Sequence, residues 1–212
     1  MQPRDGQPWI WTTWITPVLA GEAQCQYAPY VKAHFRYTKR PDDRGFNLAK
    51  WNADHTMLLE QRCRELSSEG WTIALENENS FRLKGKTAVL AGKPDIIAHR
   101  ADEWRVIDAK TGAAKNRDFW QVLLYLAAVP RAFGIPPDRL TGEVCYPTHR
   151  INVTRVDLTT AKEARIWSVI RSIASEPAPI ATPSAAECAF CDIAECQYRI
   201  TSSVTEVLVS EF

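Results

Sequence analysis

The feature that most constrains this sequence is a pair of apolar runs, each of which carries an aspartate. The first run, Ala88–Ala98, contains Asp95, and the second, Glu103–Ala109, contains Asp108. Adjacent Ile and Val residues in both runs indicate buried strands. The residues between the runs can turn the chain back, so we expect a hairpin that brings Asp95 beside Asp108. Burying a carboxylate costs free energy unless the carboxylate is paired. Two aspartates in buried strands therefore indicate a functional site.

Lys110 extends this pattern by one more position. Side chains alternate between the two faces of a strand, so Asp108 and Lys110 are expected to point the same way. Two carboxylates can hold Mg²⁺ or Mn²⁺, which prefer oxygen ligands, and such an ion lowers the pKa of bound water. A lysine beside them can orient that water or offset the negative charge that develops on a phosphate. Phosphodiester hydrolysis requires this chemistry, although an Asp-x-Lys triplet alone is more commonly a surface ion pair.

The rest of the sequence predicts a mixed α/β fold. Helical periodicity and short apolar runs alternate along the chain. A first helical pattern begins at Thr16-Pro17, with proline at the first helical position, and continues to about Tyr37 with a break near Pro29. The other expected helices are about Leu48–Glu69, Asn116–Phe133 and Ala161–Ser175. The other expected strands are Trp71–Leu75, Ser80–Leu83, Gly142–Tyr146 and Ile151–Leu158.

Length and charge set looser limits. The 212 residues suffice for one domain with a full core, and the net charge of +1 argues neither for nor against a nucleic-acid partner. Nine basic and four acidic residues lie between Arg82 and Arg117, a surface that could hold a phosphate backbone, although a solvated charged face is the simpler interpretation. We find no secretory signal and no stretch of membrane-spanning length, so we expect a cytoplasmic protein without a membrane partner.

Cysteines near the C-terminus form a second cluster. Cys188, Cys191 and Cys196 follow a proline-rich tether, Glu176–Ser184. In a reducing compartment such a trio is typical of metal or cluster ligands rather than of disulfides. Three ligands are one short of a closed site, and Cys25 is the natural fourth. The remaining two, Cys63 and Cys145, are more commonly buried small apolar residues.

The order of these motifs resembles the core of the PD-(D/E)XK nuclease superfamily, in particular its RecB-like branch. The matching segments are Gly92-Lys93-Pro94-Asp95 and Ile107-Asp108-Ala109-Lys110-Thr111-Gly112. That branch carries Gln-x-x-x-Tyr on the next helix, which Gln121 and Tyr125 match, and spacing of four puts both on one helical face. It also often carries a histidine on an upstream helix, which His55 matches; a core histidine is the alternative.

This resemblance implies a fold and a set of site residues. The fold is a restriction-endonuclease-like core, a mixed central sheet flanked by helices, with the cysteine tail packing back on the N-terminal helical region. The implied catalytic residues are Asp95, Asp108, Lys110, Gln121 and Tyr125. The implied metal ligands are His55, Asp95, Asp108 and Ala109.

The cysteines resemble those of the iron–sulfur subset of this branch, which includes the nuclease of CRISPR spacer acquisition, the AddB nuclease domain and exonuclease V. That likeness implies a 4Fe–4S cluster held by Cys25, Cys188, Cys191 and Cys196. The last gap has four residues where those families usually show five, so zinc or no cofactor remain alternatives. The resemblance also implies one nuclease domain over residues 1–212. This domain would have a catalytic core of about 48–175 and a cluster-binding subdomain of 16–47 plus 176–212.

The expected activity is that of a metal-dependent DNA nuclease, an exonuclease on single-stranded DNA ends. Its expected context is CRISPR spacer acquisition beside an integrase or other DNA-processing subunits, or DNA repair. A non-catalytic DNA-binding or assembly subunit of the same fold is one alternative, and an RNA-directed or structure-specific endonuclease of the same superfamily is another.

Overall fold

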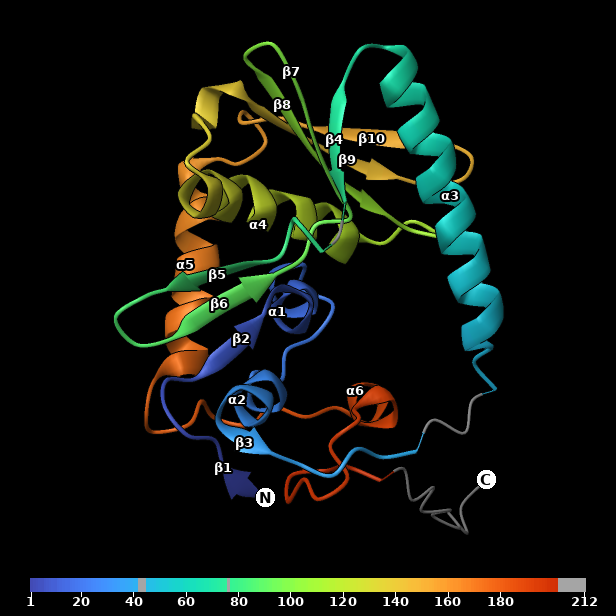
Figure 1. Ribbon diagram of the computed structural model, residues 1–212. Coiled ribbons are helices and arrows are strands. Elements are labelled where there is room, and N and C mark those ends of the chain that lie inside the picture. Colours follow the sequence, from blue (N-terminus) through green and yellow to red (C-terminus); the bar gives the residue numbers. More distant parts are fainter. Residues whose placement is uncertain (42–44, 76, 202–212) are drawn as a thin grey trace, which may run out of the picture.

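The computed structural model describes residues 1–41, 45–75 and 77–201, and its centre is a five-stranded mixed sheet (Figure 1). Strand β8 (Glu103–Ala109) lies in the middle of the order β10-β9-β8-β7-β4. The expected hairpin is present, because β7 and β8 pair antiparallel with Ile96 opposite Ile107, whereas β8 and β9 are parallel. The other strands of this sheet are β4 (Thr72–Leu75), β7 (Ile96–Arg100), β9 (Leu140–Cys145) and β10 (Arg150–Val153).

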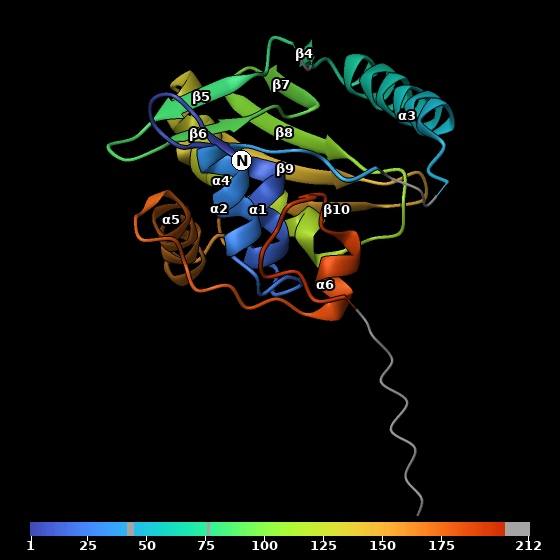
Figure 2. The same cartoon turned by 90° about the horizontal axis from the view of Figure 1, so that it is seen from below.

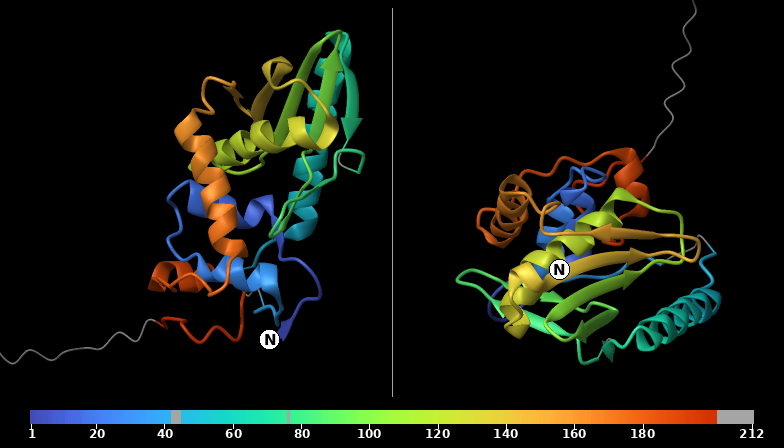
Figure 3. Two further views of the ribbon diagram at one scale, coloured as in Figure 1. Left: turned by 90° about the vertical axis from the view of Figure 1, so that its left-hand side faces the viewer. Right: turned by 90° about the horizontal axis from the view of Figure 1, so that it is seen from above.

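Helices cover both faces of the central sheet, since successive residues of β8 are buried on opposite sides. Val106 packs in the cluster that includes α4 (Asn116–Phe133), and Ile107 packs in the cluster that includes α3 (Leu48–Ser68). Figures 2 and 3 show α3 on one side of the sheet, and α4 with α1 (Thr12–Leu19) and α5 (Thr160–Ala174) on the other. The expected fold class, a mixed sheet flanked by helices, is therefore confirmed.

A second sheet of three strands lies beside the first, in the order β2-β6-β5. The expectation of one continuous strand over Ala88–Ala98 is wrong, because the chain passes from this sheet to the central sheet within that run. Pro94 lies at the crossing and has no N–H to give to a strand ladder. Gly92 ends β6 against the ring of Phe81, and a Cβ there would meet Phe81 Cζ at 2.5 Å. The strands are β2 (Trp9–Trp11), β5 (Phe81–Lys84) and β6 (Val89–Gly92).

The N-terminal region holds two short helices rather than one pattern that begins at Thr16. Helix α1 (Thr12–Leu19) contains Pro17 in its interior, and Gly21, at φ 72°, follows its end. Helix α2 (Tyr27–His34) contains Pro29 in its first turn, where backbone N–H groups have no helical partner, so the expected break at Pro29 is also wrong. Strands β1 (Gln2–Pro3) and β3 (Phe35–Arg36) pair with each other next to α2.

The later elements follow the expected bounds closely. Helix α3 is followed by Gly70 at φ 81°, and Gly134 at φ 67° caps α4. Strand β10 ends at Val153, five residues before the expected end, because Asp157 accepts a hydrogen bond from the Thr154 amide (2.8 Å) and closes a turn. The short helices η1 (Pro137–Arg139) and α6 (Ala185–Phe190) lay outside the expected set.

The C-terminal tail packs back on the N-terminal helices, as expected. Asp192 forms an ion pair with Lys32 of α2 (2.7 Å) and accepts a hydrogen bond from the hydroxyl of Tyr37 (3.0 Å). Ile193 is fully buried beside Tyr30, and Figures 1 and 2 show α6 near α1 and α2. Within the described ranges, no helix is both long enough and apolar enough to span a membrane.

Candidate active site

Several elements converge on one cavity of about 860 Å³ at the end of β8. Helix α3 contributes to one wall, α4 to another, and the crossing between the two sheets to a third. All seven residues expected in the catalytic or metal-binding set line this cavity: His55, Asp95, Asp108, Ala109, Lys110, Gln121 and Tyr125. The fold therefore brings the predicted residues together, and their roles stay predictions.

Asp108 and Lys110 lie on the same face, as the strand alternation predicted. Lys110 Nζ is 2.6 Å from Asp108 Oδ2. Gln121 contacts both side chains, so that the three form a ring of polar contacts. Its Nε2 donates to Asp108 Oδ1 (2.8 Å) and its Oε1 accepts from Lys110 Nζ (3.1 Å). One turn further along α4, the hydroxyl of Tyr125 lies 3.0 Å from Gln121 Nε2 and donates to the Lys93 carbonyl (3.4 Å). The α4 residues thus hold Asp108 and Lys110 in one orientation.

Asp95 lies just before β7. The β7–β8 register places it next to the end of β8, where its Oδ2 accepts a hydrogen bond from the Ala109 amide (2.7 Å). His55 reaches the same oxygen from α3, with Nε2 at 3.6 Å. Asp95 is thus held by the backbone of β8, with His55 of α3 nearby, and Asp108 is held by Gln121 of α4.

Burial and charge strongly perturb this centre. Desolvation raises the pKa of the Asp108 carboxyl to about 7; Lys110 opposes this rise and the nearby charge of Asp95 adds to it. Although burial alone would lower the pKa of Lys110, the charge of Asp108 raises it, so the amine stays protonated. Burial also raises the pKa of Tyr125, with a further contribution from Asp108, so its hydroxyl stays neutral. Two mutually repelling carboxylates beside one fixed cation form an arrangement that a second cation would stabilise.

The donor set suits a hard divalent cation. Asp108 Oδ2 is buried, and beyond the close approach of Lys110 it accepts no hydrogen bond from the described residues. Two neighbouring carboxylates, one of them buried, are the kind of oxygen ligand that Mg²⁺ and Mn²⁺ prefer. Over residues 1–41, 45–75 and 77–201, no three His, Cys, Asp or Glu side chains are already close enough together to hold an ion.

Several residues of the cavity were not predicted. Asp118 lies three positions before Gln121, so helical spacing could have indicated it; its carboxylate accepts from the Tyr146 hydroxyl (2.9 Å). Thr12 is buried against Tyr125, and no local signal could have linked residues so far apart in the chain. The cavity is also lined by two further lysines and three aromatic residues, Lys93, Lys115, Trp11, Phe46 and Trp51.

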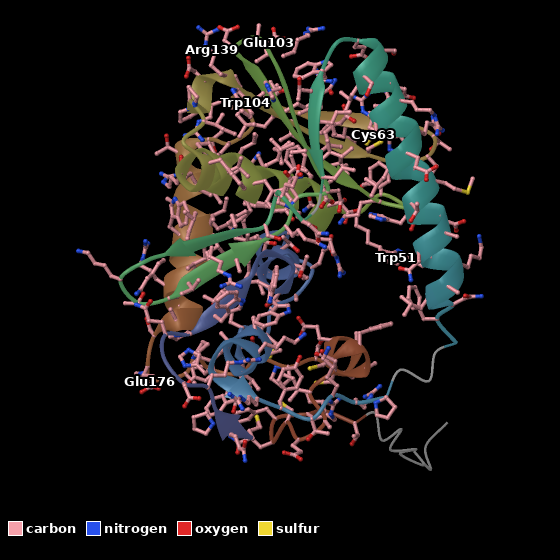
Figure 4. All side chains as sticks on the ribbon, viewed as in Figure 1. Trp51, Cys63, Glu103, Trp104, Arg139 and Glu176 are labelled. Atoms are coloured by element: carbon pink, nitrogen blue, oxygen red, sulfur yellow. The ribbon has the colours of Figure 1, made fainter. Side chains whose placement is uncertain are left out.

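The four expected cluster cysteines also share one cavity, of about 740 Å³, between α1, α2 and the tail. They are Cys25, Cys188, Cys191 and Cys196. All six cysteines are free thiols. Arg199 holds the tail by donating to the carbonyls of Cys188 (2.6 Å) and Cys191 (3.3 Å). Cys63 and Cys145 lie apart, in the apolar cluster between α3 and the sheet, as expected (Figure 4 labels Cys63).

Comparison with known proteins gives a family and little beyond it. No curated protein matches the chain. The solved structure titled "Crystal structure of SSO0001" is 14% identical, with a TM-score of 0.47 over 93% of this chain and 90% of that one. The model of the PD-(D/E)XK nuclease superfamily matches residues 22–197. That match covers most of the chain, including Asp95, Asp108 and the four cysteines that share the second cavity, so the protein belongs to the PD-(D/E)XK nuclease superfamily.

Proposed function

We propose that this protein is a metal-dependent deoxyribonuclease that hydrolyses phosphodiester bonds at Asp95 and Asp108, acting as an exonuclease on single-stranded DNA ends. The observation that carries the proposal is the convergence of these carboxylates and Lys110 on one cavity. Superfamily membership supports the reaction class, since members are typically hydrolytic nucleases.

In this proposal Asp95 and Asp108 would hold Mg²⁺ or Mn²⁺ together with His55 and the Ala109 carbonyl oxygen. Such an ion supplies a water of lowered pKa and compensates charge on the phosphate. The Ala109 amide fixes Asp95, because it donates to one carboxylate oxygen and leaves the other for the cavity. Gln121 fixes Asp108 in the same manner from α4.

Lys110 supplies the positive charge of the mechanism. Its ammonium group is held between Asp108 and Gln121, yet the side chain stays partly exposed to the cavity. There it can orient the attacking water and offset the negative charge that develops on the phosphorane and the leaving oxygen. Gln121 and Tyr125 act as positioning residues, since the Tyr125 side chain is buried and acts through Gln121.

We further propose that Cys25, Cys188, Cys191 and Cys196 hold a 4Fe–4S cluster. The support is that all four line one cavity, at the junction of the tail with the N-terminal helices. The division into a core of about 48–175 and a cluster-binding subdomain of 16–47 plus 176–212 belongs to this proposal; residues 42–44 and 202–212 of that subdomain lie outside the described ranges.

The cluster proposal has a direct test. Protein purified without oxygen should be brown, with broad visible absorbance that is lost in Cys191→Ser and kept in Cys63→Ser, because Cys63 lies in a different apolar cluster. Colourless protein would contradict the proposal, and stoichiometric zinc in it would favour a zinc site instead.

The proposed context is DNA processing, either CRISPR spacer acquisition beside an integrase or DNA repair. It rests on the resemblance of the motif order to the iron–sulfur nucleases. Co-purification of the tagged protein with an integrase subunit from its own cell would support the first context. Recovery with other repair subunits and no integrase would support the second.

The activity itself is tested with end-labelled linear and circular single-stranded DNA, and with duplex DNA, in the presence of Mn²⁺. We expect shortening of linear single strands by the wild type and no cleavage by Asp108→Ala. The matched control is Asp102→Ala, because Asp102 is an exposed aspartate of the β7–β8 turn that pairs with Arg139. Equal behaviour of wild type and Asp108→Ala contradicts the proposal. Cutting of circles would favour an endonuclease, and binding without cleavage a non-catalytic subunit.

A further inference from the structure

The mouth of the active-site cavity carries three partly exposed aromatic side chains that the proposed chemistry does not use. Trp11, Phe46 and Trp51 line the cavity and remain 36%, 60% and 40% exposed. We refer to these three residues as the aromatic rim. Single exposed apolar residues are ordinary on protein surfaces, but a group of them beside a charged cavity marks a binding surface.

Two residues of the aromatic rim belong to the start of α3. Asn47 is the N-cap of that helix, so Phe46 precedes the cap and Trp51 lies at the fourth helical position. These are the positions of a hydrophobic staple, which explains why the two rings are adjacent, at 6.5 Å and 49°. The staple does not bury them, since both keep large exposed areas.

Trp51 connects the aromatic rim to the carboxylate centre. Its ring stacks on His55 at 5.1 Å with an interplanar angle of 16°, and His55 Nε2 lies 3.6 Å from Asp95. Figure 4 shows Trp51 on the side of α3 that faces the rest of the domain. A planar group that stacked on Trp51 would therefore be separated from the carboxylate centre by the Trp51 and His55 rings alone.

Trp11 borders the cavity from a separate wall. It is the last residue of β2 and precedes α1, and the following Thr12 and Thr13 also line the cavity. Lysines from the sheet crossing and from the start of α4, Lys93 and Lys115, contribute positive charge to the same cavity. The cavity is thus lined by both aromatic side chains and cations.

We infer that the aromatic rim stacks the nucleobases of single-stranded DNA while the lysines of the cavity contact its phosphates. Every base of a single strand offers a flat π face, and aromatic side chains bind such faces with little regard to sequence. Paired bases in a duplex are covered on both faces by their neighbours, so the aromatic rim favours unpaired ends. This inference rests on the proposed nuclease function and assigns its strand preference to residues outside the carboxylate centre.

The test compares an intact single-stranded oligonucleotide with one of the same length that lacks the bases near its end. Trp51→Ala should raise KM for the intact strand about fivefold or more, with a small change in kcat. The same variant should leave KM for the abasic strand near the wild-type value, because there is no base left to stack. Trp51→Phe should restore most of the loss, since it keeps an aromatic face.

The matched control is Met57→Ala. Met57 lies on the same helix and is more exposed than Trp51, but it does not line the cavity, so both KM values should stay unchanged. Thermal unfolding of each variant separates a folding defect from a binding defect. Phe46→Ala and Trp11→Ala extend the series to the other two rings.

Equal changes of KM on intact and abasic strands would overturn the inference, because they would show a structural effect on the site. Wild-type KM values that do not differ between the two strands would overturn it while the nuclease function stands. If the wild type cleaves neither strand, the nuclease proposal fails. In that case the dissociation constants of wild type and Trp51→Ala for the two strands are measured by fluorescence anisotropy. Weaker binding of the intact strand alone by Trp51→Ala would support the stacking role of the aromatic rim, and equal changes for both strands would overturn it.

Discussion

Arg62 offers the sharpest prediction about how α3 is attached to the sheet. Its side chain is 2% exposed and forms a two-pronged pair with Glu143 of β9, itself 1% exposed, with both N···O distances at 2.8 Å. Replacing Arg62 with methionine keeps the apolar volume and leaves a buried carboxylate without its main partner. Because α3 also carries His55, two turns away, the same change should lower the rate of DNA cleavage.

The size of the stability loss depends on the positive charges that remain near Glu143 in the variant. Breaking a buried ion pair on one side costs about 3–5 kcal/mol. Arg105 and Arg150 lie 3.7 and 4.0 Å from the Glu143 carboxylate and compensate part of the charge. We therefore expect a loss of about 3 kcal/mol in the free energy of unfolding for Arg62→Met, at the lower end of that range. In a domain of this size the loss corresponds to a fall in Tm of about 6–12 °C.

Urea denaturation followed by tryptophan fluorescence measures this loss. Adding Glu143→Met to Arg62→Met should recover most of it, because the second change removes the uncompensated charge. Arg64→Met is the control, since Arg64 is an exposed residue of the same helix that forms a 3.9 Å ion pair with Glu60; it should change stability by less than about 0.5 kcal/mol. A loss below 1 kcal/mol for Arg62→Met, or additive losses in the double variant, would refute the reasoning.

Three further predictions concern packing, pH and the site. Gly142→Ala should cost about 1–3 kcal/mol in urea denaturation, because its Cβ would lie 2.3 Å from a Val122 methyl in the core. Asp157→Asn should lower stability at neutral pH; hydrogen bonds to the carboxylate lower the pKa of Asp157, so its contribution is present above the unfolded pKa of about 4 and is lost as the pH falls through the folded pKa. Unfolding curves from pH 7 to pH 2 should therefore converge for variant and wild type. Gln121→Leu should lower the cleavage rate about 10- to 100-fold by freeing Asp108, with little change in DNA affinity.

Each of these predictions has a matched reference. Gly112→Ala places a Cβ where nothing lies within 4 Å, so it should be nearly neutral, and an equal cost at both glycines would contradict the packing argument. A constant stability difference between Asp157→Asn and wild type down to pH 2 would contradict the pH argument. Full activity in Gln121→Leu would show that Asp108 needs no support from α4.

Periodicity predicted the parts of the site that lie within single elements. The two-residue repeat of a strand put Asp108 and Lys110 on one face, and the helical repeat put Gln121 above Tyr125. The short turn between β7 and β8 left a hairpin as the simplest connection, which fixed the place of Asp95. These features depend on local geometry, so they follow from sequence spacing.

Features that depend on tertiary contacts were not predictable in this way. The run that was expected as one strand divides at Gly92 because the ring of Phe81 and the second sheet occupy the space of a straight continuation. The Arg62–Glu143 pair joins residues 81 positions apart, and no spacing rule links them. The sequence predicts helix boundaries at Pro17 and Pro29, whereas each proline lies inside a short helix that packs on the core.

The most direct test of the central claim is a single-turnover measurement of cleavage on linear single-stranded DNA with Mn²⁺. Wild type, Asp108→Asn and the control Asp102→Asn are compared at saturating enzyme, so that chemistry rather than binding sets the rate. The carboxylate centre predicts that Asp108→Asn lowers the rate constant at least about 100-fold while Asp102→Asn leaves it unchanged. A rate constant for Asp108→Asn within a factor of two of the wild type would contradict the assignment of this cavity as the active site.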